Sequence, residues 1–206
     1  MLITISRLYG AGGSEVARMV AERLGWSVVD NEIVGLVARR AGLAPERVAE
    51  QDERVPGFVE RLGRALAASS QEFAVPELGV AARIEEPGLV HLTEIIVREI
   101  AAEGRVVLVG RAAPAVLGQA ADALHVKVIA ARDFRIRLAQ ELEHLDARTA
   151  ERMLDETDGQ RARYHREHYG RDWQDPVHFH MVLNTGLLGL EATAEIIVAR
   201  ARAMGW

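Results

Sequence analysis

Short apolar segments alternate with stretches of helical periodicity along the chain. The first apolar segment spans residues 2–6, and Val16, Val20 and Leu24 then recur every four residues within a helical stretch over 14–24. Further apolar segments lie at residues 27–30, 106–109, 124–131 and 181–184, and a last helix is predicted over about 189–203. Strands that alternate with helices predict a doubly wound α/β fold with a five-stranded, mostly parallel sheet.

Two regions depart from this alternation. Residues 31–104 are mostly helical in pattern and are interrupted by Pro45, Pro56, Pro76 and Pro87. Such a length exceeds a simple crossover, so we expect a helical subdomain over one edge of the sheet. Residues 148–172 are charged and dense in arginine, with few residues suited to a core. This composition predicts a solvated helix pair or a mobile flap.

A glycine cluster joins the first strand to the first helix, in the run Ser6-Arg7-Leu8-Tyr9-Gly10-Ala11-Gly12-Gly13-Ser14-Glu15. Glycines let backbone amides approach a phosphate, and the helix N-terminus adds partial positive charge. Gly12 and Ser14 fit the phosphate-loop template G-x-x-x-x-G-K-[ST], but Gly13 stands at the lysine and Arg7 at the first glycine. A dinucleotide template fails because it needs glycine at position 15. An anion site is favoured over a tight turn without a ligand.

The amino-acid composition limits the kinds of catalysis and binding that are possible. Lysine and arginine together number 25, and Lys127 is the only lysine, so 24 are arginine. The absence of cysteine removes thiolate catalysis, and a net charge of -5 argues against a general nucleic-acid-binding protein. No apolar run approaches the roughly 20 residues of a membrane span. We expect a cytoplasmic protein, without membrane contact, in which a change at mid-strand Lys127 leaves catalysis unaltered.

Several segments resemble, in order, the cytidylate kinase-like family of P-loop proteins. They are residues 6–13, Val29-Asp30-Asn31-Glu32-Ile33, Leu108-Val109-Gly110-Arg111, residues 132–137, Asp172-Trp173-Gln174-Asp175-Pro176 and Leu183-Asn184-Thr185. The resemblance implies one P-loop kinase-like, three-layer domain over residues 1–206. It has a helical monophosphate-binding insertion (31–104) and an arginine-rich lid (148–172). It also implies ATP with Mg²⁺ as donor and a nucleoside monophosphate, CMP or dCMP first, as acceptor. A glycine loop without lysine is common in this family.

The candidate residues follow from the loop, the strand ends and the resemblance. The donor phosphates are assigned to Arg7, Gly10, Ala11, Gly12, Gly13 and Ser14, whose hydroxyl could also bind Mg²⁺ or cap the helix. The acceptor is assigned to Asp30, Arg111, Asn184 and Thr185. Catalysis is assigned to Asp30 with Arg161 and Arg163 of the lid, because arginine suits the neutralisation of transferring phosphate. Asp30 is equally a helix N-cap, and Arg111 an exposed strand-end arginine.

Other residues leave alternatives open. Asp158 precedes the lid arginines, as a similar aspartate does in cytidylate kinases. Arg135 and Arg137 are two apart on a helix, so at most one of them faces a ligand. The pairs His165 with His168 and His178 with His180 lack a convincing further metal ligand. A nucleotide-binding protein without turnover and a kinase for another small acceptor stay open, as do a monomer and a homodimer.

Overall fold

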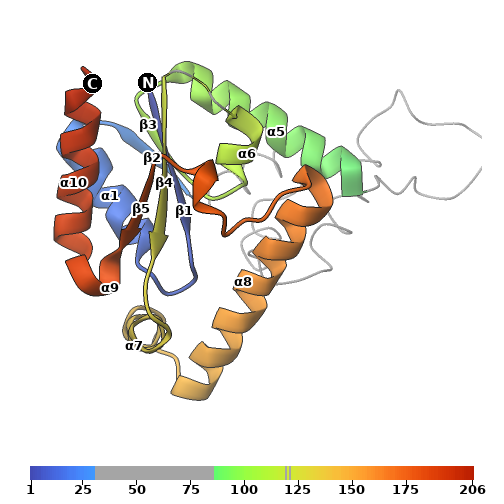
Figure 1. The fold of residues 1–206 in the computed structure, drawn as a ribbon, viewed down its shortest axis with the longest axis vertical. Coiled ribbons are helices and arrows are strands. Elements are labelled where there is room, and N and C mark those ends of the chain that lie inside the picture. Colours follow the sequence, from blue (N-terminus) through green and yellow to red (C-terminus); the bar gives the residue numbers. More distant parts are fainter. Residues whose placement is uncertain (31–85, 119, 121) are drawn as a thin grey trace, which may run out of the picture. The chain divides into compact units, whose positions relative to one another are not determined.

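The structure is a computed structural model, and it describes residues 1–30, 86–118, 120 and 122–206. The chain divides into two compact units, residues 1–30 with 98–206, and residues 31–97. The larger unit holds one five-stranded sheet in the order β2-β3-β1-β4-β5 (Figure 1). The strands are β1 (Leu2–Arg7), β2 (Ser27–Val29), β3 (Val106–Val109), β4 (Ala123–Ile129) and β5 (Met181–Asn184). The predicted α/β class and the five strands are confirmed.

All the strand pairs are parallel, with β1 between β3 and β4. In register, Ile5 lies beside Val109 of β3, and Ser6 beside Lys127 of β4. Apolar residues fill β3 and occupy every second position of β1 and β4, because both faces of a parallel sheet are covered. The carboxyl ends of the strands therefore meet at one edge, where ligands bind in open α/β sheets.

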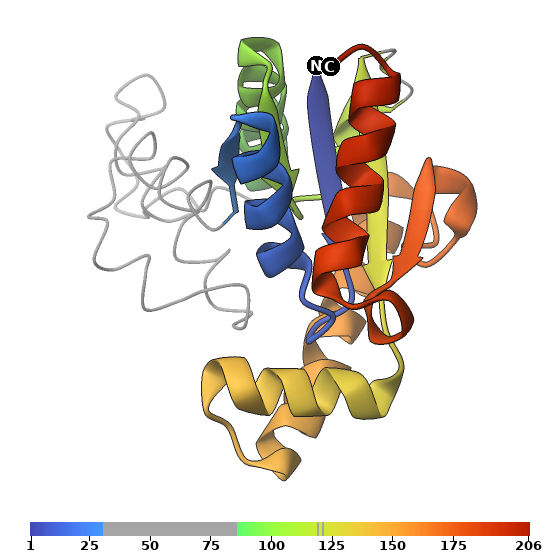
Figure 2. The same ribbon diagram turned by 90° about the vertical axis from the view of Figure 1, so that its left-hand side faces the viewer.

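One face of the sheet is covered by α1 (Gly13–Leu24) and α10 (Leu190–Ala203), which lie side by side in Figure 2. Val16 and Val20 of α1 join Ile197 of α10 and Ile3 and Ile5 of β1 in one buried cluster. On β1 and β4 the buried polar side chains are Thr4, Ser6, His125 and Lys127, which alternate with the apolar ones. The two faces of the central strands thus differ in chemistry.

The predicted lid is a single continuous helix, α8 (Ala147–Tyr169), rather than a helix pair. Asp146 caps its start by accepting a hydrogen bond from the Thr149 amide, and Gly170 ends it in the left-handed conformation. It packs on α7 (Arg132–Glu143). Tyr9, Ala139, Ala150, Met153 and Leu154 form a small apolar cluster there. The few apolar residues of this segment thus do form part of a core.

The structure also describes four other helical elements. They are α5 (Glu86–Glu103), α6 (Ala113–Leu117), α9 (Thr185–Leu188) and the short 3-10 helix η2 (Pro176–His178). Most of the predicted insertion, residues 31–104, lies outside the described residues, and its described part is α5 with Gly104. Within the described part of the chain, no helix combines the length and the apolarity that crossing a membrane requires.

Candidate functional site

The glycine loop between β1 and α1 requires its glycines. Gly10 and Gly12 have φ of 73° and 74°, in the left-handed region that side chains avoid. A Cβ at Gly10 would fall on the backbone carbonyl of Arg135, and one at Gly12 would fall on Leu190. Gly12 is also the N-cap of α1. The loop is therefore held between α7 and α10, at the start of a helix whose free amides point outward.

Arg7 takes the space in which a phosphate-loop lysine would begin. A Cβ at Gly13 would lie 2.5 Å from Arg7 Cβ and 2.8 Å from its Cγ. The Arg7 side chain then continues to Gly110, where an added Cβ would fall on its Nη1. Its Nη2 lies 3.5 Å from Asp30 Oδ1. Glycine at positions 13 and 110 thus leaves a path for one arginine across the ends of β1 and β3.

Asp30, Ser14 and Arg7 meet at the carboxyl edge of the sheet, as their placement in the sequence predicts. Ser14 Oγ donates to Asp30 Oδ2 at 2.6 Å, while Asp30 Oδ1 faces Arg7. Ser14 is not the helix cap, because Gly12 holds that position. Whether Asp30 caps a following helix depends on residues outside the described ones. A hydroxyl and a carboxylate supply the hard oxygen ligands that Mg²⁺ prefers, so this pair fits that ion.

The turn after β3 adopts a strained conformation. Gly110, Arg111 and Ala112 have φ of 76°, 55° and 51°, three left-handed residues in succession. Such a conformation costs on the order of 1–3 kcal/mol for each residue that is not glycine. The Arg7 guanidinium lies against Gly110, the first of these three residues. Sequence reasoning found Arg111 but not the strain, because only Gly110 signals it.

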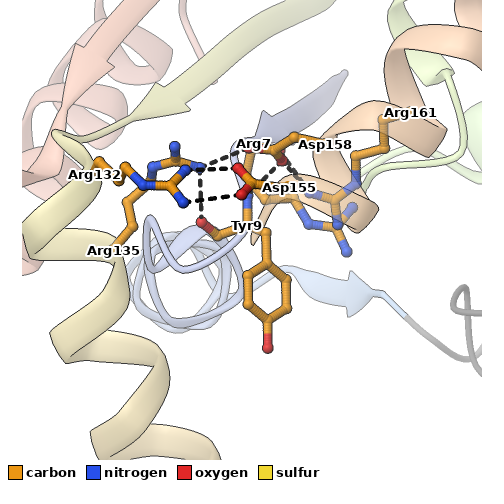
Figure 3. A network of polar contacts seen from close by, with 7 residues as sticks. All are labelled: Arg7, Tyr9, Arg132, Arg135, Asp155, Asp158 and Arg161. Atoms are coloured by element: carbon orange, nitrogen blue, oxygen red, sulfur yellow. Dashed lines mark hydrogen bonds and ion pairs between the residues drawn. The ribbon is translucent and has the colours of Figure 1, made fainter. Parts of the chain in front are cut away.

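Asp158 of α8 gathers the second group of polar contacts, drawn in Figure 3. Its Oδ1 accepts the backbone N–H of Tyr9 at 2.9 Å, and its Oδ2 accepts Arg135 Nη1 at 2.6 Å. Arg135 also donates to the Tyr9 carbonyl at 3.2 Å. One carboxylate therefore ties α7 and α8 to the start of the glycine loop. Arg135 faces this site and Arg137 is exposed, as expected for residues two apart.

Of the two predicted lid arginines, only Arg161 reaches the loop. Its Nη1 donates to the Arg7 carbonyl at 2.9 Å and lies 3.6 Å from Asp158 Oδ1. Arg163 is exposed, because a two-residue step turns it to another face of α8. The structure therefore does not bring Arg163 to the glycine loop. Tyr9, whose backbone joins Arg135 and Asp158, had no chemical signal in the sequence beyond its place in the loop.

The acceptor residues do not all come together. Thr185 is fully buried, and its Oγ1 donates to the carbonyl oxygens of Ala11 at 2.8 Å and Ile129 at 3.2 Å. It supports the loop from below, and its assignment to the acceptor is corrected accordingly. Asn184 accepts from the Gly186 amide at 3.0 Å and caps α9. It follows β5, three strand spacings or about 14 Å from the β3 end that carries Arg111.

Histidines of both predicted pairs take part in packing and hydrogen bonding within the fold. His180 Nδ1 accepts the backbone N–H of His125 at 2.8 Å, and the two rings stack at 5.2 Å. His165 is buried, and burial lowers its pKa to about 4. Within the described ranges, no group of three or more histidine, aspartate or glutamate side chains could hold a metal ion.

Strand order and loop together define the class. Five parallel strands in the order 2-3-1-4-5, with a glycine loop between the first strand and the first helix, form the fold of P-loop kinases. Within that class, the sequence model of the cytidylate kinase-like family matches residues 2–187. The chain belongs to this family, as its ordered segments predict. No curated protein sequence matches the chain.

Solved structures share the fold at low sequence identity. An uncharacterized protein from Eubacterium ventriosum is 17% identical, with a TM-score of 0.68, over 98% of this chain and 99% of that one. Shikimate kinase from Acinetobacter baumannii, in complex with shikimate, is 14% identical, with a TM-score of 0.51, over 98% and 93%. Shikimate kinase from Bacteroides thetaiotaomicron is 15% identical, with a TM-score of 0.52, over 99% and 97%. At these identities the likeness concerns the fold alone.

Proposed function

We propose that the protein transfers a phosphoryl group from ATP to a small acceptor, with a nucleoside monophosphate, CMP or dCMP first, as that acceptor. The course of Arg7 carries the proposal. It runs over Gly13, where the template has lysine, and ends beside Asp30. A delocalised cation is thereby held at the sheet edge where the phosphate loop begins. Membership of a kinase-like family supports the same reaction class.

The residues divide the work of phosphoryl transfer, in which charge spreads over the oxygens of the moving group. Backbone amides from Gly10 to Ser14 cradle the donor phosphates. Arg7 and Arg161 neutralise the charge that develops on them, and their planar guanidinium groups match phosphate geometry. Ser14 and Asp30 would hold Mg²⁺, which when bound neutralises and aligns the donor phosphates.

The acceptor occupies the β2 and β3 side of this arrangement. Asp30 orients it, and Arg111 binds its phosphate, as the family resemblance implies. Asn184 lies at the opposite edge of the sheet, four strand spacings or about 19 Å from the end of β2. We therefore assign Asn184 to the base of the donor nucleotide rather than to the acceptor. An asparagine amide both donates and accepts hydrogen bonds, so it can pair with the edge of a base.

An acceptor screen tests the proposal. The full chain is supplied with ATP and Mg²⁺ and with CMP, dCMP, UMP, AMP, GMP or shikimate, and ADP release is followed by a coupled assay. We expect CMP or dCMP to raise ADP release well above the rate with ATP alone. If shikimate or another hydroxyl compound gives the highest rate, the acceptor class changes while the reaction class stands. If no acceptor raises the rate, phosphoryl transfer is rejected.

Single substitutions on α8 test whether Arg161 contributes to the rate of phosphoryl transfer. Arg161→Met should lower turnover on the order of a hundredfold, the effect of losing one transition-state donor. The matched control is Arg152→Met on the same helix, whose side chain is 67% exposed and pairs with Glu156. An equal effect of both substitutions would show that α8 acts through stability alone and would remove Arg161 from the site.

A nucleotide-binding protein without turnover is the second candidate. It is favoured because the positive groups of the site are already paired, Arg7 with Asp30 and both Arg135 and Arg161 with Asp158. Cytidylate kinases also continue Gly-Arg-Asp where this chain has Ala112. This candidate predicts that ATP raises the melting temperature with no transfer to any acceptor. Sustained ADP release with an acceptor would exclude it.

A further inference from the structure

Lys127, the only lysine of the chain, is a buried cation on β4. Its side chain is on the polar face of the sheet, and the residue is 2% exposed. Nζ donates to the backbone carbonyl of Trp173 at 2.5 Å. The same atom lies 4.1 Å from the centroid of the Trp173 ring and 5.0 Å from that of Phe179. Two aromatic rings and one carbonyl therefore enclose the ammonium group.

This ammonium group is held without a carboxylate at ion-pair distance among the described residues. Burial lowers the pKa of Lys127 to about 8, and the charges of Arg161 and Arg171 act in the same direction. The charges of Asp158 and Asp172 oppose that shift. Burying a cation in this way is costly unless cation–π contacts and a hydrogen bond compensate. A leucine or methionine would fill the same space without the free-energy cost of burying a charge. We therefore ask what the positive charge of Lys127 does for the protein.

The contacts of Trp173 lead from Lys127 to the glycine loop. The Trp173 ring lies 6.4 Å from the ring of His165 on α8. His165 follows Arg161 by four residues and Asp158 by seven, so all three share one face of the helix. In the sheet, Lys127 pairs with Ser6, the residue before Arg7, whose carbonyl accepts from Arg161. Lys127 therefore lies beneath the part of α8 that contacts the loop.

We propose that Lys127 is a positioning residue, which anchors the segment after α8 to the sheet and so holds Arg161 and Asp158 against the glycine loop. Its link to turnover rests on the proposed function, but its link to α8 does not. The charged and titratable groups around it are Asp158, Arg161 and His165 of α8, with Arg171 and Asp172 after the helix. Among the described residues, the hydrogen bond that Lys127 Nζ donates is to the Trp173 carbonyl and not to any of these groups.

The single lysine allows a test that needs no activity. Lysine labelled with ¹³C and ¹⁵N gives one side-chain NMR signal in the full chain. We expect its Cε protons to be shifted upfield by the Trp173 ring, to lose that shift in Trp173→Leu, and to titrate near pH 8. A signal at the position of a free lysine, titrating near its ordinary pKa of 10.5, would overturn the anchor.

The positioning of α8 is measured by amide hydrogen exchange over residues 158–169. Exchange should quicken in Lys127→Met and stay close to the wild-type rate in Lys127→Arg, which keeps the cation. The matched control is Arg23→Met, which removes a cation on α1 that pairs with Glu191 outside the site. Unchanged exchange in Lys127→Met would overturn the proposal even if that variant were active.

Kinetics then connect the anchor to turnover. The anchor reverses the expectation from sequence that a change at Lys127 leaves catalysis unaltered. With the best acceptor, Lys127→Met should lower kcat on the order of tenfold at pH 7 and leave KM for ATP nearly unchanged. Wild-type kcat should fall as pH rises through 8, while Lys127→Arg should not show that fall. Identical pH profiles for these two proteins would reject the role of the charge. If wild type shows no turnover with any acceptor, the proposed function fails, and the NMR and exchange results still decide on the anchor.

Discussion

At the scale of single residues, Arg7 and Gly13 form a linked pair. Arg7 occupies the first glycine position of the phosphate-loop template, and its Cβ and Cγ fill the space that a side chain at Gly13 would need. Glycine at position 13 therefore follows from arginine at position 7. Compared with the template, this loop has an arginine at the end of the strand and no lysine at the start of the helix.

This linkage predicts the behaviour of a pair of variants. Arg7→Gly removes the cation and Gly13→Lys collides with Arg7, so each alone should lower turnover on the order of a hundredfold. The double variant R7G/G13K has the full template sequence and should recover a large part of that loss. The measurement is kcat for each protein with the best acceptor. Additive losses in the double variant would show that the two positions act independently.

Gly10 offers a test of the loop by stability. Gly10→Ala should lower the free energy of unfolding both through its positive φ and through collision with the Arg135 carbonyl. Gly25→Ala is the matched control, because φ is 66° there and open space surrounds the position. We expect about 1 kcal/mol for the control and at least about 1 kcal/mol more for Gly10, measured by urea unfolding. Equal values would mean that the loop moves aside without cost.

At the scale of elements, α8 is fastened to the loop by one partly buried carboxylate. Asp158 is 15% exposed and joins the Tyr9 amide to Arg135, whereas Asp155, one turn earlier, pairs with Arg132 on the surface and is 63% exposed. Ion pairs of similar geometry contribute differently in these settings, because water screens the outer one. The two aspartates therefore form an internal comparison on one helix.

Neutral substitutions make this comparison measurable. Asp158→Asn should lower the free energy of unfolding by about 2 kcal/mol, since it weakens hydrogen bonds between charged groups and leaves Arg135 poorly paired. Asp155→Asn should cost less than about 1 kcal/mol. Urea unfolding at neutral pH and low salt gives both values. A larger effect at Asp155 would contradict the assignment of Asp158 as the main tie of α8.

The sequence predicts these elements better than it predicts their faces. The helix over 148–172 is visible in its periodicity, and the arginines suggest a lid. Periodicity alone does not say that Arg161 faces the loop while Arg163 faces solvent, because nothing in the chain gives the rotation of α8 about its axis. That rotation is set by the apolar contacts of Met153 and Leu154 with α7, which depend on the tertiary fold.

At the scale of the whole molecule, the five strands follow from five apolar segments. The first residues of α1 and α10 each differ by one from their predicted positions. Strand order is different, because it depends on crossovers that no local pattern records. Asn184 and Asp30 both end strands, so sequence reasoning placed them in one site. The order β2-β3-β1-β4-β5 puts them at opposite edges of the sheet instead.

The pH dependence of the free energy of unfolding tests the burial of His165 on α8. Burial lowers the pKa of His165 from 6.5 to about 4 in the folded protein, so the unfolded chain binds more protons between these values. The free energy of unfolding should therefore fall as pH drops from 6.5 to 4, by up to about 3 kcal/mol. His165→Leu should remove most of this dependence, as urea unfolding at several pH values would reveal. An unchanged slope would assign the acid sensitivity to other groups, such as His125, whose pKa burial also lowers.

The distance between the two edges of the sheet also bears on how such a protein can diversify. Asp30 follows β2 and Asn184 ends β5, four strand spacings or about 19 Å apart. Substitutions at positions so far apart usually act additively. Under the proposed function, a lineage could therefore exchange its acceptor through residues after β2 and β3 while it keeps the same donor nucleotide through residues after β5. The acceptor preference and the donor preference can each change without a compensating substitution at the other site.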